Sequence, residues 1–156
     1  MPVTVTIKRN REKKTVEKKG DFNRIEKSEK RMYGPRGLLV CGYAEKERNV
    51  FLDFISDINM NDVPVIYAVN EDVSKNLGEL FAYEHRAGIT GASELPRAVI
   101  MSGLTQSELH GLMGAYREVG FVTQLWASLT PTSETWTLKT LLLELLAEAR
   151  AMQRKQ

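Results

Sequence analysis

Hydroxyl side chains gather at two points where a predicted strand gives way to a helix. One group follows the strand 98–101, and the other follows the strand 122–129, just ahead of a tryptophan. In open α/β sheets, ligands bind beyond the carboxyl ends of the strands, where free amides and the positive dipole end of a helix attract anions. The candidate ligand-binding residues are Ser102, Thr105, Thr130, Thr132, Ser133 and Trp136.

The same residues also have a purely structural interpretation. Pro131 sets a turn, a threonine or serine caps the next helix, and Trp136 packs that helix against the core. Thr105 and Glu108 have the spacing of a capping box, in which each side chain bonds a free amide of the other residue. Because caps and packed aromatic residues are much commoner than ligand sites, we favour the structural interpretation and keep the ligand site as its alternative.

A nucleophile would need a lowered pKa and a positioned base. Cys41 ends the predicted strand 38–41, but His85 and His110 have no recognisable spacing to it. We therefore expect Cys41 to be a small buried hydrophobic residue. Two histidines and one cysteine do not form a metal-binding pattern either. The sequence predicts no catalytic residue, no metal and no cofactor, and it leans against an enzyme.

Charge is divided unevenly along the chain. Residues 1–36 hold 12 Lys/Arg against 5 Asp/Glu, a net charge of +7, whereas residues 37–156 hold 10 against 15, a net charge of −5. We expect residues 1–36 to form a mobile basic arm, because a segment so poor in apolar residues buries too little surface to order itself. Its residues that would contact nucleic-acid phosphates or a protein partner include Lys8, Arg9, Arg11, Lys13, Lys14, Lys18, Lys19 and Arg24.

The elements behind these residues are an alternation of strands and helices. We predict strands over 38–41, 64–69, 98–101 and 122–129 from short apolar runs, and helices over 45–60, 77–83, 105–119 and 138–154 from apolar residues at helical spacing. This pattern predicts an α/β fold in which two tandem β-α-β-α halves, 38–88 and 98–154, form a four-stranded parallel or mixed sheet with helices packed on it. A ferredoxin-like fold is a further option, although it lacks the helix between the halves.

The two halves also match each other in register. A shift of 61 positions, without a gap, aligns Gly42 with Gly103 and Leu77 with Leu138. The order, spacing and apolar register of the elements agree, although identical residues are few. We infer an internal repeat within a single domain over 37–156, preceded by the arm.

One loop carries a family resemblance. The run Thr130-Pro131-Thr132, followed by Trp136 and Leu138, leads into a Leu/Glu-rich helix. This T-P-T-x-x-x-W-x-L signature resembles the bacterial and archaeal domain of unknown function 3783 family over 97–152. The resemblance implies a strand, a helix and the signature run, but it brings no established activity. In the first half, Val69-Asn70-Glu71 replaces T-P-T, and Lys75 stands where Trp136 would be.

These observations favour a non-enzymatic protein-interaction or regulatory, ligand-binding module, with a protein partner or a homo-oligomer. The alternative is a protein that binds RNA or DNA through the arm, although interleaved acidic residues weaken the arm's positive field. A single cysteine is typical of a reducing compartment, and no apolar run approaches the roughly 20 residues of a membrane span. We therefore expect a cytoplasmic protein that does not bind membranes.

Overall fold

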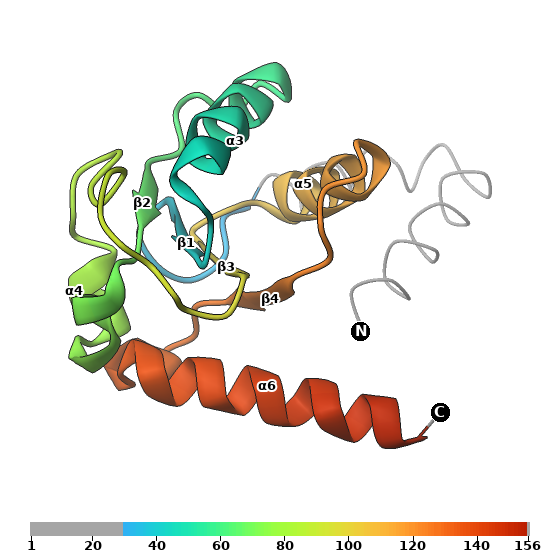
Figure 1. Cartoon of the computed structure of the whole chain (residues 1–156). Coiled ribbons are helices and arrows are strands. Elements are labelled where there is room, and N and C mark those ends of the chain that lie inside the picture. The colour runs from blue at the N-terminus through green and yellow to red at the C-terminus, as the bar shows by residue number, and fades with distance from the viewer. Residues whose placement is uncertain (1–29, 156) are drawn as a thin grey trace. The chain divides into compact units, whose positions relative to one another are not determined.

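The computed structural model describes residues 30–155, with side chains through residue 153, and the first 29 residues of the expected arm lie outside it. The first half contains β1 (Gly37–Cys41), α3 (Glu45–Asp57), β2 (Val65–Tyr67), a 3-10 turn (Asn70–Ser74) and α4 (Leu77–Leu80) (Figure 1). The second half contains β3 (Ala98–Ser102), α5 (Gln106–Glu118), β4 (Leu125–Ser128), a 3-10 turn (Ser133–Thr135) and α6 (Leu138–Lys155). The predicted α/β fold is confirmed.

The four strands form one mixed sheet in the order β2-β1-β3-β4. β1 pairs in parallel with β2, and β3 pairs in parallel with β4, as expected for strands joined by a crossover helix. The two central strands, β1 and β3, are antiparallel, and Leu39 lies opposite Ile100 at the middle of their ladder. Of the two arrangements that the sequence leaves open, the mixed sheet is therefore the one that forms.

The described residues divide into two compact units. The unit that holds the sheet comprises residues 33–103 together with the chain from Val122 onward. The other comprises residues 30–32 and Leu104–Phe121, and α5 is its helix. Within this second unit, the Met32 amide donates to the Leu104 carbonyl, and the rings of Tyr116 and Phe121 lie 5.1 Å apart.

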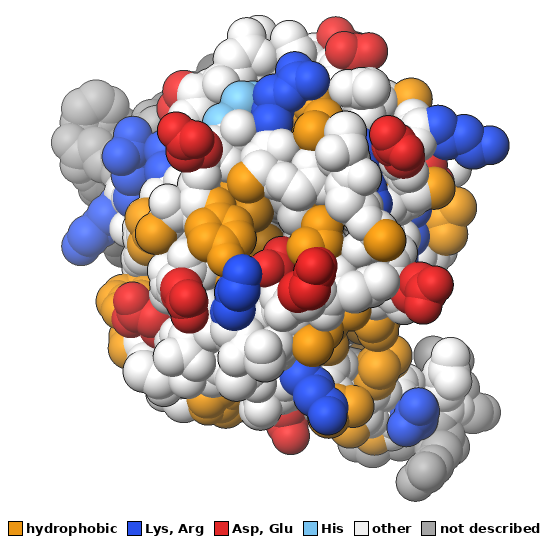
Figure 2. Space-filling model, turned by 60° about the vertical axis from the view of Figure 1, so that its left-hand side comes forward, with side chains coloured by type: hydrophobic (Ala, Val, Ile, Leu, Met, Phe, Trp, Pro, Cys, Tyr) orange, Lys and Arg blue, Asp and Glu red, His pale blue; other side chains and the backbone are white. Residues whose placement is uncertain are grey.

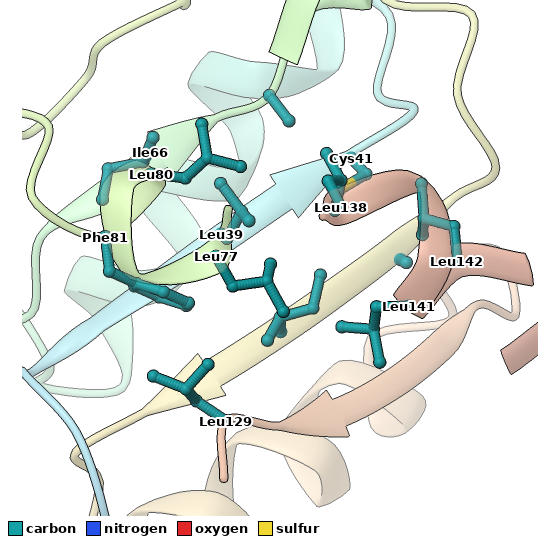
Figure 3. Close-up of a cluster of buried hydrophobic side chains, with 13 residues drawn as sticks. Leu39, Cys41, Ile66, Leu77, Leu80, Phe81, Leu129, Leu138, Leu141 and Leu142 are labelled. Atoms are coloured by element: carbon teal, nitrogen blue, oxygen red, sulfur yellow. The ribbon is translucent and has the colours of Figure 1, made fainter. Parts of the chain in front are cut away.

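Helices cover both faces of the sheet. α3 lies on one face, and α4 and α6 lie on the other (Figure 1). Side chains alternate between the faces of a strand, so every second residue of each strand joins the cluster beneath α4 and α6. This cluster includes Leu39, Cys41, Ile66, Leu77, Leu80, Leu138, Leu141 and Leu142 (Figure 3). Its members are at most 7% exposed, so this face of the sheet forms a dry core.

A buried arginine joins α3 to the segment that packs beside β2. The Arg48 side chain is 3% exposed, and its Nε donates to the Tyr43 carbonyl at 3.1 Å. One of its terminal nitrogens donates to the carbonyls of Gly88, at 3.3 Å, and Ile89, at 2.7 Å. The guanidinium also lies 5.8 Å from the centre of the Tyr67 ring. A buried charge needs hydrogen-bond partners, and three backbone carbonyls accept from this guanidinium.

Several elements differ from their predicted bounds. α3 ends at Asp57 rather than at residue 60, and β2 spans Val65–Tyr67 rather than 64–69. α4 ends at Leu80, although the apolar pattern predicts a helix over 77–83, because the chain turns to bond the outer edge of β2 through Arg86 and Ala87. β4 begins at Leu125 rather than at residue 122, because the ladder with β3 begins where Leu125 meets Ala98. Periodicity alone does not show where a neighbouring strand begins.

Among the described helices, none is both long enough and apolar enough to cross a membrane.

Candidate functional site

Ser102 ends β3 with a buried hydroxyl. The residue is 1% exposed, and its Oγ has no hydrogen-bond partner. The backbone of Gly34 lies directly against it, since a Cβ placed on Gly34 would come within 2.3 Å of that oxygen. Only glycine fits such a close approach, and Gly34 also has a φ of +99°. The hydroxyl is therefore covered by the chain rather than open to a crevice.

Thr105 caps α5 and belongs to the unit of that helix. The Glu108 amide donates to Thr105 Oγ1 at 3.1 Å, and the Thr105 amide donates to Glu108 Oε1 at 2.9 Å. This confirms the predicted capping box. The residue is 5% exposed, and both partners in the box are satisfied by each other. The other five candidate residues belong to the unit that holds the sheet.

The hydroxyls of Thr130 and Ser133 bond each other and the backbone of their own turn. The Thr130 amide donates to Ser133 Oγ at 3.0 Å, and the Ser133 amide donates to Thr130 Oγ1 at 3.0 Å. The two oxygens lie 3.1 Å apart. Thr132 is exposed, and its carbonyl accepts from the Thr135 hydroxyl. These bonds are those of a hydroxyl-stabilised turn, which competes with a ligand for the same donors and acceptors.

Trp136 is half-buried and packs against the core beneath α4 and α6. Its carbonyl accepts from the Leu77 amide at 3.0 Å, and the Leu138 amide donates to the Lys75 carbonyl at 3.0 Å. Between these two bonds, Asn76 and Thr137 face each other as an isolated antiparallel bridge. The signature loop of the second half is thus joined through its backbone to the matching loop of the first half.

Sequence reasoning missed this junction, because Lys75 and Asn76 have no signature of their own. The signal was nevertheless present. A shift of 61 positions places Lys75, Asn76 and Leu77 on Trp136, Thr137 and Leu138, which are the residues that meet. Thr137 was missed as well, although it caps α6 by accepting from the Thr140 amide at 3.2 Å.

The first half builds its equivalent turn from charged residues. Asp72 is 3% exposed, and its carboxylate accepts from the Val69 amide at 2.9 Å, as Ser133 accepts from Thr130. Lys75 pairs with the same carboxylate at 3.2 Å and donates to the Tyr83 hydroxyl. Hydrogen bonds to Tyr83 and then to Asp72 raise the pKa of Lys75 above its ordinary value. The buried carboxylate is therefore balanced by a cation.

Cys41 is sealed in the core, as expected. It is fully buried and unpaired, and burial raises the pKa of its thiol to about 12, with a smaller contribution from the charge of Asp72. A thiol with so high a pKa remains protonated at neutral pH and is a poor nucleophile. Within residues 30–155, no three His, Cys, Asp or Glu residues are grouped so that they hold a metal ion.

The described part of the chain has nearly balanced charge. Residues 30–155 contain 13 Lys/Arg and 15 Asp/Glu, a net charge of −2. On the face that Figure 2 shows, acidic and basic side chains alternate with hydrophobic ones. The predicted contact residues Lys8, Arg9, Arg11, Lys13, Lys14, Lys18, Lys19 and Arg24 lie outside the described residues. The positive charge expected to attract nucleic acid therefore belongs to the arm and not to the described fold.

We predict that Trp136→Ala destabilises the protein. The loss in free energy of unfolding should be about 2–4 kcal/mol, because the indole is half-buried and contributes less than a fully buried aromatic residue. Urea denaturation measures it. Thr132→Ala, on the same loop but exposed, is the matched control and should change stability by no more than about 0.5 kcal/mol. Equal stability of the Trp136→Ala variant and the parent would contradict the structural role.

The comparisons with known proteins concern the second half of the chain. No curated protein and no solved structure matches the sequence. A family model matches residues 97–152, which span β3, α5, β4 and most of α6. Its description is "Domain of unknown function (DUF3783)", and it is the family that the T-P-T-x-x-x-W-x-L signature predicts. The second half of this chain therefore resembles the DUF3783 family.

Proposed function

We propose that this protein is a non-enzymatic protein-interaction module, in which the signature loop joins one β-α-β-α unit to another. The observation that carries the proposal is the pair of backbone bonds between Leu77 and Trp136 and between Leu138 and Lys75. Together with the five-residue ladder of β1 and β3, they join the halves in the way that strand addition joins two chains. In this chain, the first half is the binding partner of the DUF3783-like second half.

The state of the candidate side chains supports a role in binding over one in catalysis. An enzyme that uses a nucleophile needs a base within hydrogen-bond reach of it. Cys41 and Ser102, at equivalent strand ends, are both buried, and the Ser102 hydroxyl has no partner. Thr130 and Ser133 satisfy each other.

We also place the protein in the cytoplasm, since its one cysteine stays reduced in the core. Cell fractionation tests this placement.

Ladder register supports our proposal that the halves arose by duplication of one unit. The pair Leu39–Ile66 becomes Ile100–Ala127 after a shift of 61 positions. The same shift turns α3 into α5 residue for residue. Close backbone approaches correspond too, since Gly42 packs against residues 95–97 and Gly103 packs against residues 34–36. A repeated unit explains all three correspondences at once.

A split chain tests the pairing proposal. We expect residues 1–90 and 91–156, co-expressed as separate chains, to purify together as a one-to-one complex. The break falls between Thr90 and Gly91, outside every strand and helix. A tag on one piece and sedimentation of the product measure the association. Ile100→Pro is the control, because it removes an amide at the centre of the β1–β3 ladder. The proposal would be contradicted if the two pieces did not associate. It would also be contradicted if they associated equally well with and without Ile100→Pro.

Recovery of binding partners from lysate distinguishes a protein-interaction function from RNA or DNA binding through the arm. We expect the intact protein either to form a homo-oligomer in light scattering or to capture a specific protein from lysate. A variant with Lys13, Lys14, Lys18 and Lys19 changed to Gln should behave in the same way. Nuclease-sensitive, salt-dependent capture that this variant loses would favour RNA or DNA binding through the arm instead. A monomer that captures no protein would count against the proposal.

A transplant of turn residues tests the duplication. If the turns are equivalent, Val69→Thr, Asp72→Ser and Lys75→Trp together should keep the free energy of unfolding within about 1 kcal/mol of the parent. Asp72→Ser alone leaves Lys75 without its carboxylate, and this control should lose about 1–2 kcal/mol. Urea denaturation distinguishes the two. A triple variant less stable than the single variant would show that the turns are not equivalent.

A further inference from the structure

We propose that residues 85–91 form a plug over the outer edge of β2 and that protonation of His85 loosens it. The inference concerns this edge of the sheet and does not depend on the proposed function. An exposed strand edge invites pairing with other chains, so natural proteins cover such edges. In this protein one bond of the cover is made by the imidazole ring of His85.

Successive residues of the plug form hydrogen bonds with the backbone groups on the outer edge of β2. The Val65 amide donates to His85 Nδ1 at 2.9 Å. The Arg86 amide donates to the Val65 carbonyl at 2.7 Å, and the Tyr67 amide donates to the Ala87 carbonyl at 2.8 Å. Residues 85–87 thus run along β2 in the place of a fifth strand, except that the first bond comes from a side chain.

The two ends of the plug are held with different strength. Arg48 holds the far end by donating to the carbonyls of Gly88 and Ile89. Gly88 also lies so close to β2 that a Cβ on it would come within 2.0 Å of the Tyr67 carbonyl oxygen. The near end has the His85 bond and Arg86, whose φ of 74° is unfavourable for a residue with a Cβ. The near end is therefore the one that opens first.

Protonation removes the acceptor on which the near end depends. A neutral imidazole accepts through its unprotonated nitrogen, whereas an imidazolium has N–H groups at both positions and accepts nothing. A proton on Nδ1 would therefore face the N–H of Val65, and the two donors would separate. His85 is exposed, so protons reach it from solvent without any opening of the fold.

Ionisable groups occur on the segment of His85 itself, on β2, on α4 and in the loop before β2. Glu84 and Arg86 flank it on its own segment, and β2 offers no ionisable group except the Tyr67 phenol. α4 contributes Glu79, and Asp62, in the loop before β2, is paired with Arg36. Partial shielding of the exposed ring from water, and then the charge of Arg86, lower the pKa of His85 below its ordinary value of 6.5. Because the folded pKa is lowered, the contribution of His85 to stability is fully present above pH 6.5, the ordinary pKa of the unfolded chain. It is lost as the pH falls from there through the lowered folded pKa.

Amide hydrogen exchange of the intact protein tests the proposal. We expect the Val65 amide to lose protection, after correction for intrinsic rates, as the pH falls from about 8 to about 5. His85→Asn should abolish this loss, because the Asn oxygen accepts at every pH. His85→Ala should leave Val65 unprotected throughout. His110→Asn, which changes the chain's other histidine, is the matched control and should retain the pH dependence of the parent.

Two results would overturn the proposal that protonation of His85 loosens the plug. One is a pH dependence at Val65 that persists in His85→Asn. The other is a pH dependence that disappears in His110→Asn.

Discussion

The antiparallel pairing of β1 with β3 is the constraint on which the rest of the structure depends. All ten residues of the two strands are buried, and nearly all their side chains are apolar. In such a dry environment, each backbone amide and carbonyl must find a partner, and the neighbouring strand provides it. Once Leu39 lies opposite Ile100, the parallel partners β2 and β4 fall on opposite sides, and the order of the sheet follows.

The halves differ most where they reach the edges of the sheet. After α4, the first half turns back and covers β2, and the chain bonds Val65 and Tyr67. At the equivalent place, the second half continues as α6, which extends to Lys155, and the residues of β4 are only half-buried. One unit can therefore end in a short helix and a covering loop or in a long helix, because Leu77 and Leu138 are both fully buried in the same cluster.

The turn in each half contains a backbone amide that needs an acceptor, and the two halves provide it with different side chains. Both turns need an acceptor for the amide that precedes them. Ser133 supplies a hydroxyl to Thr130, whereas Asp72 supplies a carboxylate to Val69 and is neutralised by Lys75. Trp136 takes the place of Lys75 and packs against the core instead. Two side-chain sets that hold one geometry indicate that the geometry, rather than the threonines themselves, is what the fold requires.

The sequence by itself determined the order and kind of the elements, the burial of Cys41 and the cap at Thr105, because these depend on local spacing and apolar pattern. Only the tertiary structure decided that the central strands are antiparallel, that α4 stops at Leu80, and that Lys75–Leu77 meet Trp136–Leu138. It also showed that Thr130 and Ser133 bond each other and that Gly34 covers Ser102. Apart from the turn of Thr130 and Ser133, these features depend on contacts between residues distant in sequence, and such contacts leave no periodic trace in the chain.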